Sequence, residues 1–248
     1  MQSSRFLARP SLGGLGGLMR TVAVVGRKGG SGKTTLAVHL AMGFVLRGRT
    51  TILADADPQR SAIEVFKGRS EAGDRSDPGP ELIATSGSKL FALKTSAMNA
   101  GAEALVIDTP AVLEDETAKA VVLADLSLLV VRPTFLDLSA AVRTTSIIRQ
   151  LRRPGLVVLN QAPAPRESVE PPIVKRAMEA LDMLRFPIAP VVIRTRAVYQ
   201  TVMESGRSVE ELGADTLAAQ EMRELCAFID RLVFGSTPKA NPQTQRRA

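Results

Sequence analysis

Short apolar runs alternate with longer amphipathic stretches along most of the chain. The runs are rich in Val, Ile and Leu at consecutive positions, which is typical of strands buried on both faces. We expect such strands at residues 21–26, 50–55, 104–108, 126–131, 155–160 and 189–193, and residues 82–86 could add an edge strand. Helical spacing is found at 33–47, 88–99, 114–124, 137–152, 171–184 and 216–233. The pattern predicts an α/β fold with one doubly wound, mostly parallel sheet and helices on both faces.

The helix expected at 137–152 has a clear apolar stripe. Its predicted buried stripe consists of Leu138, Ala141, Val142, Thr145, Ile148 and Leu151. The arginines at its C-terminal end lie outside this stripe and suit the negative end of a helix dipole. For this helix alone, the structural explanation of its basic residues is favoured over nucleic-acid binding.

Composition and charge divide the chain of 248 residues into three parts. Residues 1–20 and 235–248 each carry three basic residues and no acidic one, so they account for most of the net charge of +7. We interpret 1–20 as a flexible basic leader and 235–248 as a disordered basic tail. Either Met1 or Met19 could be the natural start. The domain between them, 21–234, is nearly neutral, so any affinity for nucleic acid requires a local basic patch.

The single cysteine, Cys226, restricts the functions that the chain can have. It excludes an internal disulfide and a multi-cysteine metal site within one chain. Because it lies in an apolar helical pattern, we expect a buried, reduced thiol and a cytoplasmic protein. No apolar run reaches the length of about 18 residues that spans a membrane.

Residues 26–35, GRKGGSGKTT, predict a phosphate-binding loop between a strand and a helix. The common pattern G-x-x-x-x-G-K-[ST] does not fit, because Arg27 stands at the first glycine position; K-G-G-x-G-K-T fits from Lys28. Backbone N–H groups of Gly29, Gly30, Ser31 and Gly32 are expected to surround phosphate oxygens. Lys33 would then bridge the β- and γ-phosphates, the Thr34 hydroxyl would bind Mg²⁺ and Thr35 would contact the α-phosphate.

The phosphate loop contains a second lysine, Lys28. It precedes the turn of the loop and cannot easily reach the γ-phosphate alongside Lys33. A lysine aimed outward could instead neutralise charge on a nucleotide held by a facing subunit. An exposed charge next to Arg27, with no function, is the alternative.

Carboxylates follow two of the expected strands. Asp55 and Asp57 lie at the end of the second strand, and Asp108 at the end of the strand 104–108. The carboxyl ends of parallel strands border the crevice where ligands bind. We expect Asp108 to hold Mg²⁺ through water and Asp57 to orient or deprotonate the attacking water. Thr34, Asp57 and Asp108 are therefore the predicted metal-site residues.

The segments KGGSGKTT, DADPQ and VIDTPA together resemble the deviant Walker A ATPases, and most of all the ParA-type partition ATPases. The similarity covers essentially residues 21–234 and corresponds to the short form without an N-terminal helix-turn-helix. It implies a P-loop NTPase that uses ATP and Mg²⁺ and forms a homodimer when ATP is bound. By this resemblance, Lys28 is the signature lysine that crosses the dimer interface and Asp57 is the catalytic aspartate. Asn160 and Gln161 match the segment that meets the adenine.

The same resemblance implies the partners. In that family the ATP-bound dimer binds double-stranded DNA without sequence preference, and a ParB-like partner stimulates hydrolysis, for plasmid or chromosome segregation. A nucleoid-associated cytoplasmic location would follow. The candidate DNA contacts are the late arginines Arg194, Arg196, Arg207, Arg223 and Arg231. For each of them taken singly, a solvated charge near Glu204, Glu210 or Glu221 is the favoured explanation.

Departures from the family and rival functions remain. His39 stands where the family often has Asn, and we assign it no role beyond packing; the segment PAVLEDET replaces a Pro-Pro-Gly form.

A MinD-like membrane regulator is disfavoured because 216–233 carries acids on its polar face, so no stable membrane association is expected. Cysteine and tyrosine counts exclude a nitrogenase-reductase type and a tyrosine kinase. A ParA-like ATPase that positions a protein cargo or compartment would have the same core and stays open.

Overall fold

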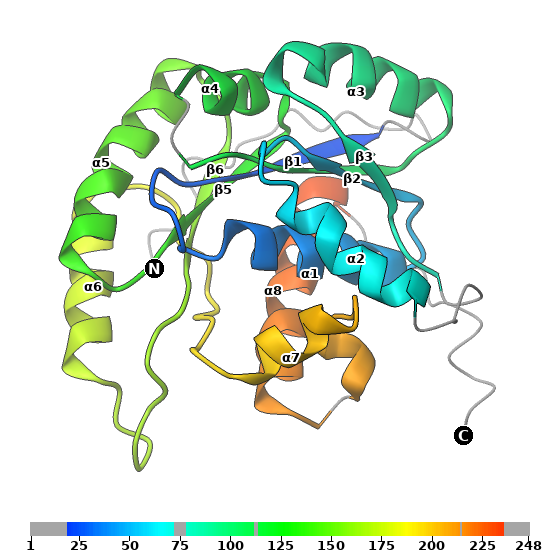
Figure 1. Cartoon of the computed structure of the whole chain (residues 1–248). Coiled ribbons are helices and arrows are strands. Elements are labelled where there is room, and N and C mark those ends of the chain that lie inside the picture. Colours follow the sequence, from blue (N-terminus) through cyan, green and yellow to red (C-terminus); the bar gives the residue numbers. More distant parts are fainter. Residues whose placement is uncertain (1–18, 72–77, 112–113, 214, 236–248) are drawn as a thin grey trace.

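The computed structural model of this chain describes residues 19–71, 78–111, 114–213 and 215–235 (Figure 1). Its six strands form one sheet in the order β3-β2-β4-β1-β5-β6, and all the paired strands are parallel. The strands are β1 (Arg20–Val25), β2 (Thr51–Asp55), β3 (Glu81–Ala84), β4 (Ala104–Asp108), β5 (Leu126–Val131) and β6 (Gly155–Leu159). The predicted parallel α/β sheet is confirmed.

Helices cover both faces of this sheet (Figure 1). They are α1 (Lys33–Leu46), α2 (Ser61–Glu71), α3 (Leu90–Asn99), α4 (Glu114–Leu123), α5 (Phe135–Gln150), α6 (Pro172–Met183), α7 (Val198–Glu204) and α8 (Leu217–Phe234), with 3₁₀ turns η1 (Gly87–Lys89) and η2 (Val209–Leu212). In β1, Val22 and Val24 pack toward α1, α2, α7 and α8, whereas Ala23 and Val25 pack toward α3 to α6. This alternation explains why β1 is apolar at every position from Val22 to Val25.

The prediction of a seventh strand at 189–193 is wrong. Residues 189–193 form no strand ladder, and the isolated bridges here, Val157 to Ile188 and Ala162 to Arg194, lie just outside the two ends of the segment. Pro190 lies within the segment and Pro187 just before it, and proline has no N–H to donate to a strand ladder. The edge strand suggested at 82–86 is present as β3.

Two helices, α2 and α7, were not predicted from the sequence. The N-terminus of α2 is capped from a distance: the Asp55 carboxylate accepts the N–H groups of Ala62 (3.1 Å) and Ile63 (3.3 Å). A cap this far upstream leaves no local sequence signal of the usual kind. Asp55, grouped with the site residues in the sequence, therefore has a structural task.

The buried stripe of α5 is close to the prediction but narrower. Ala141, Thr145 and Ile148 are buried as expected, and Thr144 joins them. Val142 is 48% exposed, so its placement in the stripe is wrong. Val142 lies one residue beyond Ala141, which turns it about 100° away around the helix.

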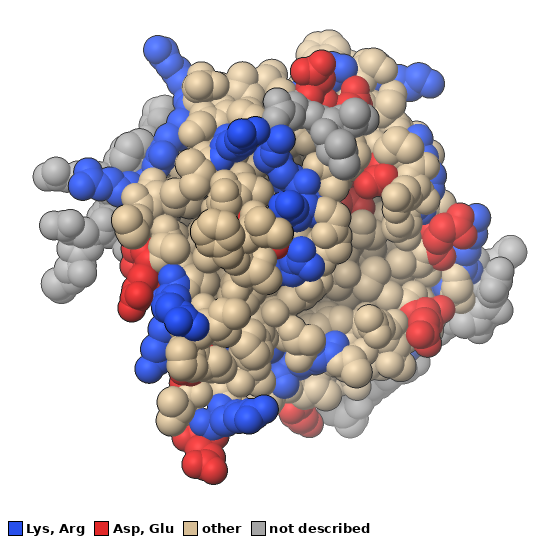
Figure 2. Space-filling model, turned by 60° about the vertical axis from the view of Figure 1, so that its left-hand side comes forward, with Lys and Arg blue, Asp and Glu red and all other residues tan. Residues whose placement is uncertain are grey.

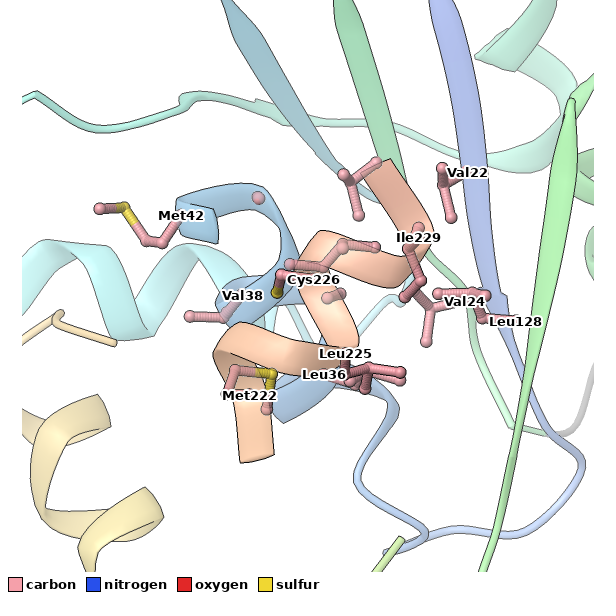
Figure 3. Close-up of a cluster of buried hydrophobic side chains, with 14 of the residues drawn as sticks. Val22, Val24, Leu36, Val38, Met42, Leu128, Met222, Leu225, Cys226 and Ile229 are labelled. Atoms are coloured by element: carbon pink, nitrogen blue, oxygen red, sulfur yellow. The ribbon is translucent and has the colours of Figure 1, made fainter. Parts of the chain in front are cut away.

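A close contact between α1 and α8 fixes the helix that follows the phosphate loop (Figure 3). A Cβ on Gly43 of α1 would lie 2.6 Å from the sulfur of Cys226 in α8, so only glycine allows this approach. Cys226 is a buried free thiol, as predicted, and burial raises its pKa well above the usual value. Its Sγ lies 3.8 Å from the carbonyl oxygen of His39.

The predicted ends of the domain fall largely outside the described residues. The leader 1–20 and the tail 235–248 can be compared only at their inner edges. Arg20 already belongs to β1, and Met19 is buried in the core. Within the described ranges, no helix has the length and apolar character needed to cross a membrane.

Candidate nucleotide-binding site

The predicted phosphate loop lies at the carboxyl edge of the sheet, between β1 and α1 (Figure 1). β1 is a central strand, flanked by β4 and β5. In the register of the sheet, Val24 is paired with Asp108 and Asp55 with Asp108. The structure therefore brings together the loop and the carboxylates that the sequence assigned to one site, in the position where open α/β sheets bind ligands.

Lysine and arginine side chains gather on this side of the molecule. Figure 2 shows them in a band through the middle of the face, with most acidic side chains nearer its edge. A band of positive charge on this face favours a polyanionic ligand.

The conformation of the loop requires its glycines. Gly30 has φ 72° and Gly32 has φ 91°, values that residues with a Cβ rarely adopt. A Cβ on Gly32 would also overlap the Nδ2 atom of Asn160. The loop therefore has the backbone that a phosphate cradle needs, with the N-terminus of α1 directly behind it.

Lys33 lies inside the loop. Its side chain is only 7% exposed, and its Nζ donates a weak hydrogen bond to the carbonyl oxygen of Lys28 at 3.4 Å. Burial lowers the pKa of this ammonium, whereas Asp108 and Asp57 act to raise it. A buried cation with so few partners is suited to bind phosphate oxygens of its own nucleotide.

Lys28 is in different surroundings. It is half-buried at the entrance of the loop, and its ammonium makes no hydrogen bond or ion pair with the described residues. With α5 it lines a cavity of about 10 Å³. The two lysines of the loop are thus separated in their environments, while the role of Lys28 across an interface stays a prediction.

Asp108 is the most unusual acid of the site. It is fully buried, and neither carboxylate oxygen has a hydrogen-bond partner of good geometry. Burial raises its pKa to about 7, although the approach of the Thr34 hydroxyl and the charge of Lys33 lower it. Within the described ranges no three His, Cys, Asp or Glu residues could hold a metal ion. A buried carboxylate beside a threonine hydroxyl nevertheless fits Mg²⁺, which takes much of its coordination from water and phosphates.

Asp57 remains available for chemistry. It is half-exposed in the turn after β2, and its Oδ1 accepts the N–H of Gln59 at 2.9 Å. Its charge reaches both Lys33 and Asp108. This position is compatible with the predicted task of orienting water.

Asn160 and Gln161 contact the loop itself. Asn160 Nδ2 donates to the carbonyl oxygen of Ser31 at 2.8 Å, and Gln161 Nε2 donates to that of Gly30 at 3.0 Å. Both amides therefore support the outer side of the phosphate loop from the end of β6. The sequence did not reveal this task, and the adenine contact stays a prediction.

The candidate DNA-binding arginines are of two kinds. Arg194 holds the Glu170 carboxylate with two hydrogen bonds, of 2.6 and 2.8 Å, and Arg196 is paired with Glu221. Their guanidinium groups are thus engaged within the chain. Glu221 was among the acids that the alternative explanation named, whereas Glu170, the partner of Arg194, was not. The side chains of Arg223 and Arg231 form no ion pair within the described part of the chain. These two are freer to meet a phosphate backbone.

Sequence reasoning missed Arg132, which directly follows β5 and reaches the phosphate loop. Its Nη1 would lie 3.8 Å from a Cβ placed on Gly30. The only signal in the sequence was its place just after a buried strand, at the ligand-binding edge of the sheet.

His39, the only histidine, is completely buried in α1. Its Nδ1 lies 2.8 Å from the carbonyl oxygen of Thr35, and its ring packs edge-on against Tyr199. Burial lowers its pKa to about 4. The packing role expected from the sequence agrees with this environment.

Replacing His39 with asparagine should flatten the dependence of stability on pH. The folded pKa of about 4 lies below the ordinary value of 6.5, so the unfolded state takes up the proton first as the pH falls. Stability is therefore full above pH 6.5 and is lost toward pH 4, by about 3 kcal/mol in total. Urea unfolding at pH 7, 5.5 and 4.5 measures this, and an unchanged pH slope in the variant would contradict the assignment.

Comparison with known proteins shows the family. The chain belongs to the CobQ/CobB/MinD/ParA nucleotide binding domain family, which matches residues 22–230. It is 33% identical over 213 residues to the maintenance of carboxysome distribution protein A of Halothiobacillus neapolitanus, covering 83% of this chain and 94% of that protein. It is 27% identical to the antiactivator FleN of Pseudomonas aeruginosa, covering 87% and 94%. The protein is therefore a ParA/MinD-family ATPase.

Solved structures agree on the fold. The ATP complex of a Cyanothece McdA variant has a TM-score of 0.72 at 15% identity, covering 91% of this chain and 100% of that one. The septum site-determining protein MinD of Pyrococcus horikoshii, complexed with Mg-ADP, has a TM-score of 0.67 at 20% identity, covering 87% and 97%. At these identities the likeness establishes the P-loop fold of the ParA/MinD type.

Proposed function

We propose that this protein is a Mg²⁺-dependent ATP hydrolase that works as an ATP-controlled dimeric switch. The observation that carries the proposal is the different setting of the two loop lysines. Lys33 is buried within the loop, whereas the Lys28 ammonium has no partner among the described residues. One cation serves its own nucleotide, and the other is left for a nucleotide in a second subunit.

Each residue of the site then has a task. The N–H groups of residues 29–32 and the start of α1 bind the phosphates, with Lys33 between the β- and γ-phosphates and Thr35 at the α-phosphate. Thr34 and, through water, Asp108 would hold Mg²⁺, which supplies charge neutralisation when it is bound. Asp57 orients the attacking water, and Lys28 from the partner subunit stabilises the charge on the transferred phosphoryl group.

The ATP-bound dimer is proposed to bind double-stranded DNA without reading its sequence and to be released by an adaptor-stimulated hydrolysis. The basic band around the site and the unpaired Arg223 and Arg231 support a phosphate-directed interaction. A MinD-like interaction with lipid is less well supported. The apolar side of α8, with Met222, Leu225 and Ile229, is buried against the core and leaves no apolar face for a membrane.

The cargo is the point at which two functions separate. Segregation of a plasmid or chromosome follows from the partition-type motifs. Positioning of a protein assembly is favoured by one observation: the Halothiobacillus carboxysome-distribution protein aligns with 83% of this chain, whereas the chromosome-partitioning ATPase Soj of Thermus thermophilus aligns with 22%. We favour positioning of a protein cargo, with DNA as the surface on which the dimer moves.

Sedimentation of the full chain with and without ATP and duplex DNA tests the proposal. The expected result is a monomer alone, a dimer with ATP and Mg²⁺, and a dimer–DNA complex that dissociates as salt rises. A monomer at saturating ATP would overturn the switch, and a dimer that ignores DNA at low salt would overturn the DNA step alone. Co-purification of a protein assembly, rather than of a centromere-bound adaptor, would support the cargo function.

A further inference from the structure

The first turn of α5 holds a buried carboxylate next to the phosphate loop. Asp137 is 4% exposed. Its Oδ1 accepts from Arg132 Nε at 3.0 Å, and its Oδ2 accepts from Arg132 Nη2 at 3.1 Å and from the Thr134 hydroxyl at 2.6 Å. Burial by itself would raise the pKa of this carboxyl, but these hydrogen bonds lower it. Asp137 is therefore a buried anion whose charge is satisfied mainly by Arg132.

Lys28 and Asp137 line the same small cavity. Its wall also includes Ala140, Ala141 and Thr144 of α5, and its volume is about 10 Å³. A flexible lysine that lines the same cavity as a buried carboxylate would normally pair with it. The structure shows no such pair, since the planar fork of Arg132 already occupies both oxygens of the carboxylate. A bidentate arginine holds a carboxylate better than a lysine can.

We propose that Arg132 is a positioning residue that keeps Lys28 free. By holding Asp137, it prevents the carboxylate from capturing the Lys28 ammonium, so that this ammonium can meet the phosphates bound by a second copy of the chain. The inference rests on the proposed role of Lys28 in the dimer. Arg132 is well placed for the task, because it spans the distance between Asp137 and Gly30 of the loop.

Removal of Arg132 has a specific consequence. An unpaired anion in a buried position is costly, and the protein will neutralise it with the nearest available cation. Two further cations, Arg27 and Lys28, border the same cavity. Arg27 already has a partner, whereas Lys28 has none among the described residues, so Lys28 fits that description. Once paired with Asp137, Lys28 is withdrawn from the interface.

The test is a rescue experiment with the full chain. Arg132→Ala should reduce ATP-dependent dimerisation and ATP hydrolysis by about 10-fold or more, while ADP binding by the monomer changes less than about 3-fold. The double variant Arg132→Ala/Asp137→Asn also removes the buried carboxylate that would pair with Lys28. ATP-dependent dimerisation and ATP hydrolysis should then return to within about 3-fold of the wild type. Asp137→Asn alone should stay near the wild type. Arg20→Ala, which breaks a half-exposed pair with Asp125, is the matched control and should change neither property.

Each outcome decides the matter. Wild-type dimerisation together with a normal Arg132→Ala variant would overturn this inference and leave the proposed function standing. A defective Arg132→Ala variant that Asp137→Asn does not rescue would overturn it as well, because Arg132 would then act directly. A wild type that stays monomeric with ATP would overturn both proposals. If Arg132→Ala does not fold, Arg132→Gln, which keeps most of the side chain but removes its charge, takes its place with and without Asp137→Asn under the same expectations.

Discussion

Replacing Lys33 with alanine is expected to lower the affinity for ATP by a factor on the order of 100 or more, and the affinity for ADP, which lacks the γ-phosphate, by a factor on the order of 10 or more. The ammonium is buried in the loop with a single weak hydrogen bond, so its binding capacity is available for phosphate. Each charge-assisted hydrogen bond contributes about 1.5–3 kcal/mol, and two phosphates would share this cation. No other lysine of the loop can replace it, since Lys28 lies at the loop entrance.

Isothermal titration with ADP, in which dimerisation plays no part, measures the effect. The same variant should fold as well as the wild type without nucleotide, because burial penalises this charge. Lys67→Ala is the control, as Lys67 is exposed on α2 and paired only with Glu64. Wild-type affinity in the Lys33→Ala variant would show that the loop does not bind phosphate in the proposed way.

The parts of the fold that the sequence predicted are those with a strong local signal. Strands β1, β2, β4, β5 and β6 are apolar at nearly every position because helices cover both faces, and such runs stand out. The segment 189–193 is also mostly apolar but lacks the ladder, because Pro190 interrupts it and Pro187 lies just before it. Helix α2 was not predicted because the residue that caps it, Asp55, lies six residues before the helix and belongs to a strand.

The residues of the candidate site also fall into those that the sequence predicts and those that it does not. The glycines, Lys33, Thr34 and Asp108 follow from spacing along the chain, and the structure brings them to one edge of the sheet. Asn160 and Gln161 lie more than a hundred residues from the phosphate loop along the chain, so their contacts with it could not be predicted from the sequence. Only the sheet order, which places β6 two strands from β1, makes these contacts visible.

The late arginines illustrate a limit of charge counting. From the sequence, Arg194 and Arg196 are the same kind of residue as Arg223 and Arg231. The structure pairs the first two with Glu170 and Glu221, which lie 24 and 25 residues away in the chain. A basic side chain is a candidate for DNA binding only when it forms no ion pair with an acidic side chain of the fold.

The second large effect is expected from Lys28→Ala. The variant should bind ATP as a monomer within about 3-fold of the wild type, because Lys33 and the loop backbone are intact. Dimerisation with ATP should be lost, and hydrolysis should fall by about 10²–10³-fold, the range found when one group that stabilises transition-state charge is removed. This separation of binding from turnover distinguishes a cation acting across an interface from an ordinary loop charge.

Sedimentation equilibrium with ATP and a steady-state phosphate-release assay measure the two effects on one preparation. Lys28→Arg serves as the charge-preserving variant, and partial dimerisation is expected because the cation is kept but its shape is changed. Mixing Lys28→Ala with Lys33→Ala chains gives the sharpest result. A cation that serves the neighbouring nucleotide lets such a mixed dimer assemble one complete site, in which the Lys33→Ala subunit supplies Lys28 and the Lys28→Ala subunit binds ATP. If hydrolysis does not reappear in the mixture although each variant is folded, Lys28 acts within its own subunit and the interface role is wrong.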